Sequence, residues 1–127
     1  MNVFSMNGVG GVECVTMPLD ETTKETIGKN YDSAKGMAVA LTGNNTVGYG
    51  SADAPLFGIL RKVEHDGFAT VQVKGFAVEL ISEADASAIN KYAAVDGAGG
   101  VKSAGDGVVS NGYITSVEDD GTVTIIM

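Results

Sequence analysis

The chain has 127 residues, enough for a single domain that buries about two-thirds of its unfolded surface. Its 16 acidic and 8 basic residues give a formal net charge of −8, which repels phosphate backbones and anionic membranes, and no basic cluster offsets it. One cysteine excludes an intrachain disulfide, and no apolar run approaches the roughly 18 residues of a membrane span.

Glycine accounts for 18 residues and lies between short β-branched runs, which is typical of an all-β domain with many tight turns. We predict a small β-barrel or a compact β-sandwich with at most one or two short helices. Residues 1–30 are expected to form an N-terminal strand or arm and a linker, and residues 31–127 a β-barrel domain. The predicted strands, in chain order, are Val12–Met17, Met37–Leu41, Thr46–Tyr49, Phe57–Val63, Phe68–Lys74, Phe76–Ile81, Tyr92–Val95, Val108–Val109, Gly112–Val117 and Thr122–Met127.

Two other segments and one glycine interrupt this pattern. Residues 19–32 have few apolar side chains and no clear period, so we interpret them as a loop. Residues 82–90, SEADASAIN, favour a short helix, with Ser82 as its N-cap. The apolar set Phe76, Val78 and Leu80 is out of phase with the preceding strand, which predicts a β-bulge or corner at Gly75.

KVEHDGFATVQV (62–73) resembles SVEDDGTVTIIM (116–127): both contain Val-Glu, Asp-Gly and a threonine three residues after the glycine. We interpret them as two hairpins that use the same turn chemistry, with an internal duplication as the alternative.

No group of residues predicts catalysis. His65 is the only histidine and directly precedes Asp66-Gly67, so it is expected to be a turn residue of a hairpin. Cys14, in GVECVTM, is expected to be a small buried core residue. The glycine clusters at 7–13 and 96–107 precede strand-like runs rather than a helix and lack a P-loop ending. Most carboxylates adjoin turn glycines, so the sequence predicts no enzyme, no metal site and no cofactor.

Four segments, NGVGGVECVTM, ATVQVKGFAVEL, YAAVDGAGGVKSA and SVEDDGTVTIIM, together resemble the head decoration (capsid cement) proteins of tailed bacteriophages. The similarity covers most of the chain in the same order. It implies a small β-rich structural protein that binds the outer surface of the expanded head and clamps neighbouring major capsid subunits, often as a trimer. It implies no cofactor and no catalysis.

This resemblance predicts synthesis in the host cytoplasm and a place on the outer capsid surface of the virion, with the major capsid protein as partner and neither nucleic acid nor membrane bound. The first eleven residues contain no secretory signal pattern. Residues 1–9 carry no charged side chain and are suited to β-augmentation of a capsid edge, whereas residues 12–17 have pairing within their own barrel as an equal alternative. The predicted capsid contacts are Val3, Phe4, Met6, Val9 and Val12.

The alternative function is a β-rich receptor- or carbohydrate-binding module of the virion. An aromatic content of 6% counts against it, because such modules bind their ligands largely through aromatic side chains.

Overall fold

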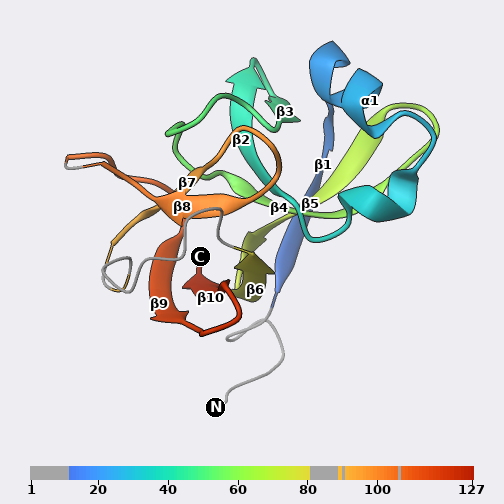
Figure 1. Ribbon diagram of the computed structural model, residues 1–127. Coiled ribbons are helices and arrows are strands. Elements are labelled where there is room, and N and C mark those ends of the chain that lie inside the picture. The colour runs from blue at the N-terminus through green and yellow to red at the C-terminus, as the bar shows by residue number, and fades with distance from the viewer. Residues whose placement is uncertain (1–11, 81–88, 90, 106) are drawn as a thin grey trace.

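The computed structural model describes residues 12–80, 89, 91–105 and 107–127, which form three β-sheets, one α-helix and a 3-10 turn (Figure 1). The fold is mostly β, as predicted, and its sheets are not closed into a barrel. The elements are β1 (Glu13–Pro18), α1 (Glu21–Ile27), the 3-10 turn η1 (Tyr31–Ala34), β2 (Ala38–Gly43), β3 (Thr46–Gly48), β4 (Gly58–Val63), β5 (Phe68–Lys74), β6 (Phe76–Leu80), β7 (Ala93–Val95), β8 (Val101–Ser103), β9 (Tyr113–Val117) and β10 (Thr122–Ile126).

The main sheet has five antiparallel strands in the order β1-β5-β4-β2-β3. Its two ends meet at one point, where Leu19 forms an isolated parallel bridge with Val47 and the Asp20 N–H donates to the Val47 carbonyl at 2.9 Å. On the N-terminal side of Leu19, β1 pairs only with β5 among the described strands and is therefore an edge strand of the sheet.

The main sheet separates two apolar cores. Side chains alternate along a strand, so Val39 of β2 and Leu60 of β4 face one core, whereas Ala38 and Ile59 face the other. The first core includes Leu19 and residues of α1 and η1. The second core lies between the main sheet and the two smaller sheets, β6-β10-β9 and β7-β8. Both faces of the central strands are therefore buried.

The chain passes from the main sheet to the β6-β10-β9 sheet at Gly75, which has a φ of 114°. The buried Gln72 side chain holds this passage: its Nε2 donates to the carbonyls of Lys74 at 3.3 Å and Phe76 at 3.1 Å. Its Oε1 accepts from Nε of Arg61 at 2.8 Å. The predicted corner at Gly75 is confirmed.

The two similar segments form hairpins with the same turn bonds. The Glu64 N–H donates to the Phe68 carbonyl at 2.8 Å, and Asp66 Oδ1 accepts from the Phe68 N–H at 3.1 Å. In the second hairpin the Glu118 N–H donates to the Thr122 carbonyl at 2.8 Å, and an Asp120 oxygen accepts from the Thr122 N–H at 3.0 Å. Of the shared residues, the aspartate and the glycine are the ones that these turns require.

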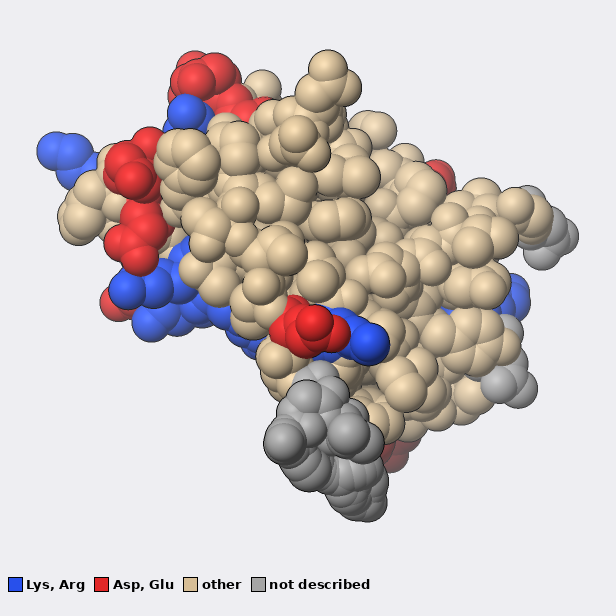
Figure 2. Space-filling model, turned by 180° about the vertical axis from the view of Figure 1, so that it is seen from behind, with Lys and Arg blue, Asp and Glu red and all other residues tan. Residues whose placement is uncertain are grey.

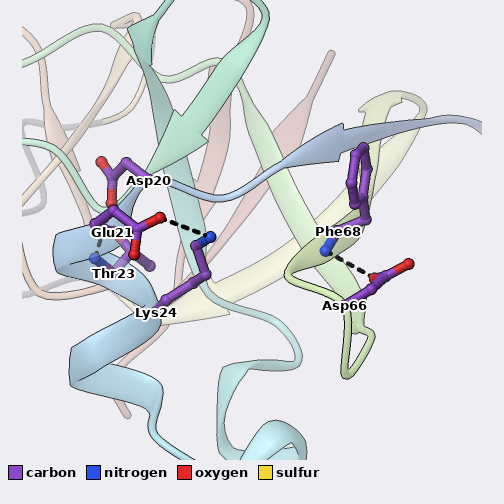
Figure 3. A network of polar contacts seen from close by, with 6 residues as sticks. All are labelled: Asp20, Glu21, Thr23, Lys24, Asp66 and Phe68. Carbon is purple, nitrogen blue, oxygen red and sulfur yellow. Dashed lines mark hydrogen bonds and ion pairs between the residues drawn. The ribbon is translucent and has the colours of Figure 1, made fainter.

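The prediction of a loop over residues 19–32 is wrong, because α1 and η1 lie within or begin in this segment. Asp20 caps α1 by accepting from the Thr23 N–H at 2.7 Å (Figure 3). The Thr23 hydroxyl oxygen accepts from the Tyr49 N–H at 3.0 Å. Lys24 forms an ion pair with Glu21 at 2.9 Å. Only Thr23 and Ile27 of the helix are buried, so it shows no continuous apolar stripe.

One strand prediction is wrong, and one strand was missed. Val108–Val109 is not a strand, and the Val109 side chain is 69% exposed. The strand is β8 instead, which pairs with β7 through contacts such as Val95 opposite Val101. The predicted helix at 82–90 falls almost entirely outside the described residues.

The contribution of the Asp20 cap to the stability of the fold depends on pH, because the carboxyl group titrates. Burial raises its pKa, but hydrogen bonds from the hydroxyl and N–H of Thr23 and from the Thr42 hydroxyl, with the nearby charge of Lys24, outweigh burial and hold the pKa below its ordinary value of 3.8. A carboxyl with a lower pKa in the folded state stabilises the fold above its unfolded pKa, and this contribution is lost as the pH falls through the folded pKa.

Asp20→Ala should lower the free energy of unfolding by about 0.5–2 kcal/mol near neutral pH, because it removes the helix cap. Urea unfolding of both proteins should show this difference shrinking as the pH falls through the folded-state pKa of the wild-type carboxyl, which lies below 3.8. Asp20→Asn is the matched variant that retains a capping oxygen. A difference independent of pH would contradict a role for the carboxylate charge.

Gly75→Ala should destabilise the protein by roughly 1–3 kcal/mol. A Cβ at this position would lie 3.1 Å from Cγ2 of Val12 and 3.2 Å from Nε2 of Gln72, in a backbone with a φ of 114°. Gly121→Ala is the control, because Gly121 has a similar φ of 89° but no atom within 4 Å of the added Cβ. If thermal or urea unfolding shows the same decrease in stability for Gly75→Ala and Gly121→Ala, crowding around Gly75 does not contribute to the destabilisation.

Candidate interaction surface

The outer face of the β6-β10-β9 sheet carries a line of apolar and aromatic side chains that crosses its strands. Ile126 of β10 lies opposite both Phe76 of β6 and Tyr113 of β9, and Tyr92 forms an isolated bridge with Tyr113. Residues directly opposite in an antiparallel pair project from the same face. The adjacent side chains Ala77, Ile114 and Ile125 are buried in the second core. We call Phe76, Ile126, Tyr113 and Tyr92 the apolar row.

Three of the four residues of the apolar row are exposed, and Tyr113 is half-buried. Phe76 is 61% exposed, Ile126 40% and Tyr92 37%, and the rings of Tyr92 and Tyr113 meet edge to face with centroids 5.3 Å apart. With strands spaced about 4.8 Å apart, the row forms a continuous strip roughly 15 Å long. Contiguous exposed apolar side chains are characteristic of surfaces that bind another protein.

Sequence reasoning missed the apolar row. The apolar alternation of Phe76, Val78 and Leu80 suggests that Phe76 faces the core, yet the small Ala77 is the buried residue. The signal that identifies the row is the pairing of strands distant in sequence, which brings Phe76 next to Ile126.

The segment that precedes β1 joins the fold beside the apolar row. Val12 is exposed, and its Cγ2 lies within 3.1 Å of a Cβ placed on Gly75, the residue before Phe76. Among the predicted capsid contacts, Val12 is therefore next to the row. The others, Val3, Phe4, Met6 and Val9, lie outside the described residues.

β1 itself pairs with β5, with Val15 opposite Val71 and Thr16 opposite Thr70. Pairing within the protein's own sheet is thus the alternative that the structure shows for this strand. Glu13 at its start forms an ion pair with Lys74 at 3.4 Å. As an edge strand, β1 leaves its side chains from Glu13 to Thr16 exposed.

The prediction that Cys14 is buried is wrong. The thiol lies on β1 opposite Gln72 and is exposed, because an edge strand has neighbours on one side only. His65 lies in the turn between β4 and β5, which precedes the first residue of β5. Cys14 lies opposite Gln72, which is at least four residues further along β5. A strand rises about 3.3 Å per residue, so the two side chains lie more than about 13 Å apart along the sheet and do not form a nucleophilic pair.

His65 instead borders a shallow depression between α1 and the β4–β5 turn. Its ring meets that of Tyr31 edge to face with centroids 4.8 Å apart. The depression has a volume of about 230 Å³, and its buried floor is formed by Leu19, Ile27 and Val63. The contact of His65 with Tyr31 is a packing contact between two rings.

The described residues contain no cluster of three or more His, Cys, Asp or Glu side chains that is able to hold a metal ion. Within the same residues, no helix has the length and apolar character needed to span a membrane.

Charge is distributed unevenly over the face of the molecule opposite to the view in Figure 1. Seen from behind, charged side chains gather towards one end, and much of the remaining face shows neither basic nor acidic residues (Figure 2). Five lysines form ion pairs with carboxylates: Lys24, Lys35, Lys62, Lys74 and Lys102. The charge of each of these lysines is therefore balanced by a neighbouring carboxylate.

Comparison of the chain with models of known protein families, with curated proteins and with solved structures finds no match.

Cys14 should react stoichiometrically with a thiol reagent such as Ellman's reagent in the native protein, because its side chain is exposed. Cys14→Ser should change the free energy of unfolding by no more than about 0.5 kcal/mol, as is usual at surface positions. A thiol that reacts only after denaturation would contradict the exposed position.

Proposed function

We propose that this protein is a head decoration protein of a tailed bacteriophage, which binds the outer surface of the expanded head and clamps neighbouring major capsid subunits. The observation that carries the proposal is the exposed apolar row beside Val12, on an acidic β-rich protein. We infer that the row and the segment leading to Val12 contact the capsid.

The energetics of the row favour a protein partner. Phe76 is 61% exposed, and covering this exposed part contributes about 1–2 kcal/mol, since full burial of such a side chain contributes about 1.5–3 kcal/mol. Phe76 and Ile126 are direct cross-strand neighbours, so a single apolar surface of a partner is able to cover both. An extended strip across the outer face of a sheet suits a macromolecular surface better than a small ligand, which binds in a concave pocket.

The resemblance to decoration proteins involves the same region. ATVQVKGFAVEL includes Phe76, YAAVDGAGGVKSA begins at Tyr92, and SVEDDGTVTIIM includes Ile126. The fourth segment, NGVGGVECVTM, runs through Val12 into β1. Segments far apart in the sequence thus contribute three of the four residues of the apolar row.

Co-sedimentation with expanded, genome-filled heads that lack their own decoration protein tests the proposal. Decoration predicts saturable binding at a fixed ratio to the major capsid protein. Absence of binding to heads of its own phage would reject the proposal and favour the alternative of a receptor- or carbohydrate-binding module.

Phe76→Ser should weaken head binding by about fivefold or more, since covering the exposed 61% of the side chain contributes roughly 1 kcal/mol or more. Its fold should persist, because the side chain faces solvent. Val109→Ser is the matched control: this valine is 69% exposed, lies outside the row, and should bind heads like the wild type. Equal binding by both variants would exclude the row from the contact.

A further inference from the structure

The outer edge of β1 has a defined set of outward-pointing backbone groups. The Leu19 N–H donates to the Gly67 carbonyl at 3.0 Å, and the register continues with Met17 opposite Ala69 and Val15 opposite Val71. In an antiparallel ladder, bonded pairs recur at every second residue. The backbone groups of Val15 and Met17 therefore point towards β5, and those of Cys14 and Thr16 point away from the sheet.

Among the described strands, only β5 pairs along β1, which ends the strand order of the main sheet. β3 approaches β1 only past its C-terminal end, where Val47 pairs with Leu19 and bonds to Asp20. Pro18 occupies the next outward-pointing position. Proline has no backbone N–H, and none is needed there because no strand pairs on that side. The open part of the edge thus runs from Cys14 to Thr16.

We propose that this open edge receives an extended segment of the major capsid protein as an added strand. The inference rests on the proposed function for the identity of the partner. Unpaired N–H and C=O groups along an edge recognise the main chain of an extended peptide, and the flanking side chains adjust the preference. Here Val12 and Val15 are exposed and uncharged, which favours an apolar segment.

The added strand lies beside the apolar row. Val12 precedes β1 and contacts the corner at Gly75, directly before Phe76. One capsid surface is therefore able to place a strand on the edge and apolar side chains on the row. A second copy of the chain fits less well, because each copy carries a net charge of −8.

Thr16→Pro tests the strand addition. It removes an N–H that points away from β5 and places a proline ring on the open edge, where the main sheet tolerates it. The variant should unfold like the wild type and bind heads about tenfold more weakly or worse, as expected for loss of backbone bonds to an added strand. Thr16→Val keeps the N–H and should bind normally. Val15→Pro is the opposite control, since it removes an N–H directed at β5 and should destabilise the fold.

The outcomes separate the two proposals. If the wild type binds heads and a folded Thr16→Pro protein binds equally well, the edge is not used, while decoration stands. If the wild type does not bind heads, both proposals fail together. A wild-type dimer in solution that Thr16→Pro dissociates identifies a second copy as the occupant and overturns the inference.

Should Thr16→Pro fail to fold, the native thiol provides a second measurement on the wild type. Cys14 is exposed in the same stretch of edge, so an added strand should slow its reaction with maleimide on decorated heads by about tenfold or more. An unchanged rate on decorated heads overturns the inference.

Discussion

The fold depends on the way in which buried Gln72 holds the chain as it leaves one sheet for the next. An unpaired amide at a buried position costs about 1–3 kcal/mol, and Gln72 avoids this cost by bonding the carbonyls on both sides of the Gly75 corner and the Arg61 side chain. Asn111 strengthens the same junction, because its Nδ2 donates to the carbonyls of Phe57 and Val73, each at 2.8 Å. Together these amides fix the angle at which β6 departs from β5, and with it the direction in which the apolar row faces.

Local chemistry explains which parts of the fold were predictable. The hairpins closed by Asp66-Gly67 and Asp120-Gly121 were located correctly, since their turns are determined by residues adjacent in sequence. α1 was not, because it is stabilised by tertiary contacts: Thr23 bonds to Tyr49, 26 residues away. β8 was missed because it is short and its pairing with β7 is not visible in its own sequence.

The candidate surface was harder to predict than the fold. Cys14 has a sequence typical of a buried strand, and its exposure follows from the position of β1 at the sheet edge, which the sequence does not encode locally. The sequence pattern groups Phe76 with the other apolar side chains of its strand. In the structure, the register of β6 against β10 directs Ala77 into the second core instead. A one-residue difference in phase reverses every side chain of a strand, so the row follows only from knowledge of the partner strands.

The position of the main sheet between two cores has a consequence for cooperativity. β2 and β4 contribute alternate residues to each core. A loss of packing in one core therefore disturbs these two strands, and through them the packing of the other core. Val39 and Ala38 are adjacent in the chain yet belong to different cores, and local unfolding of one exposes the backbone that supports the other. We therefore expect the two cores to melt as one unit, in a single two-state transition, with the slowest amide exchange along β2 and β4.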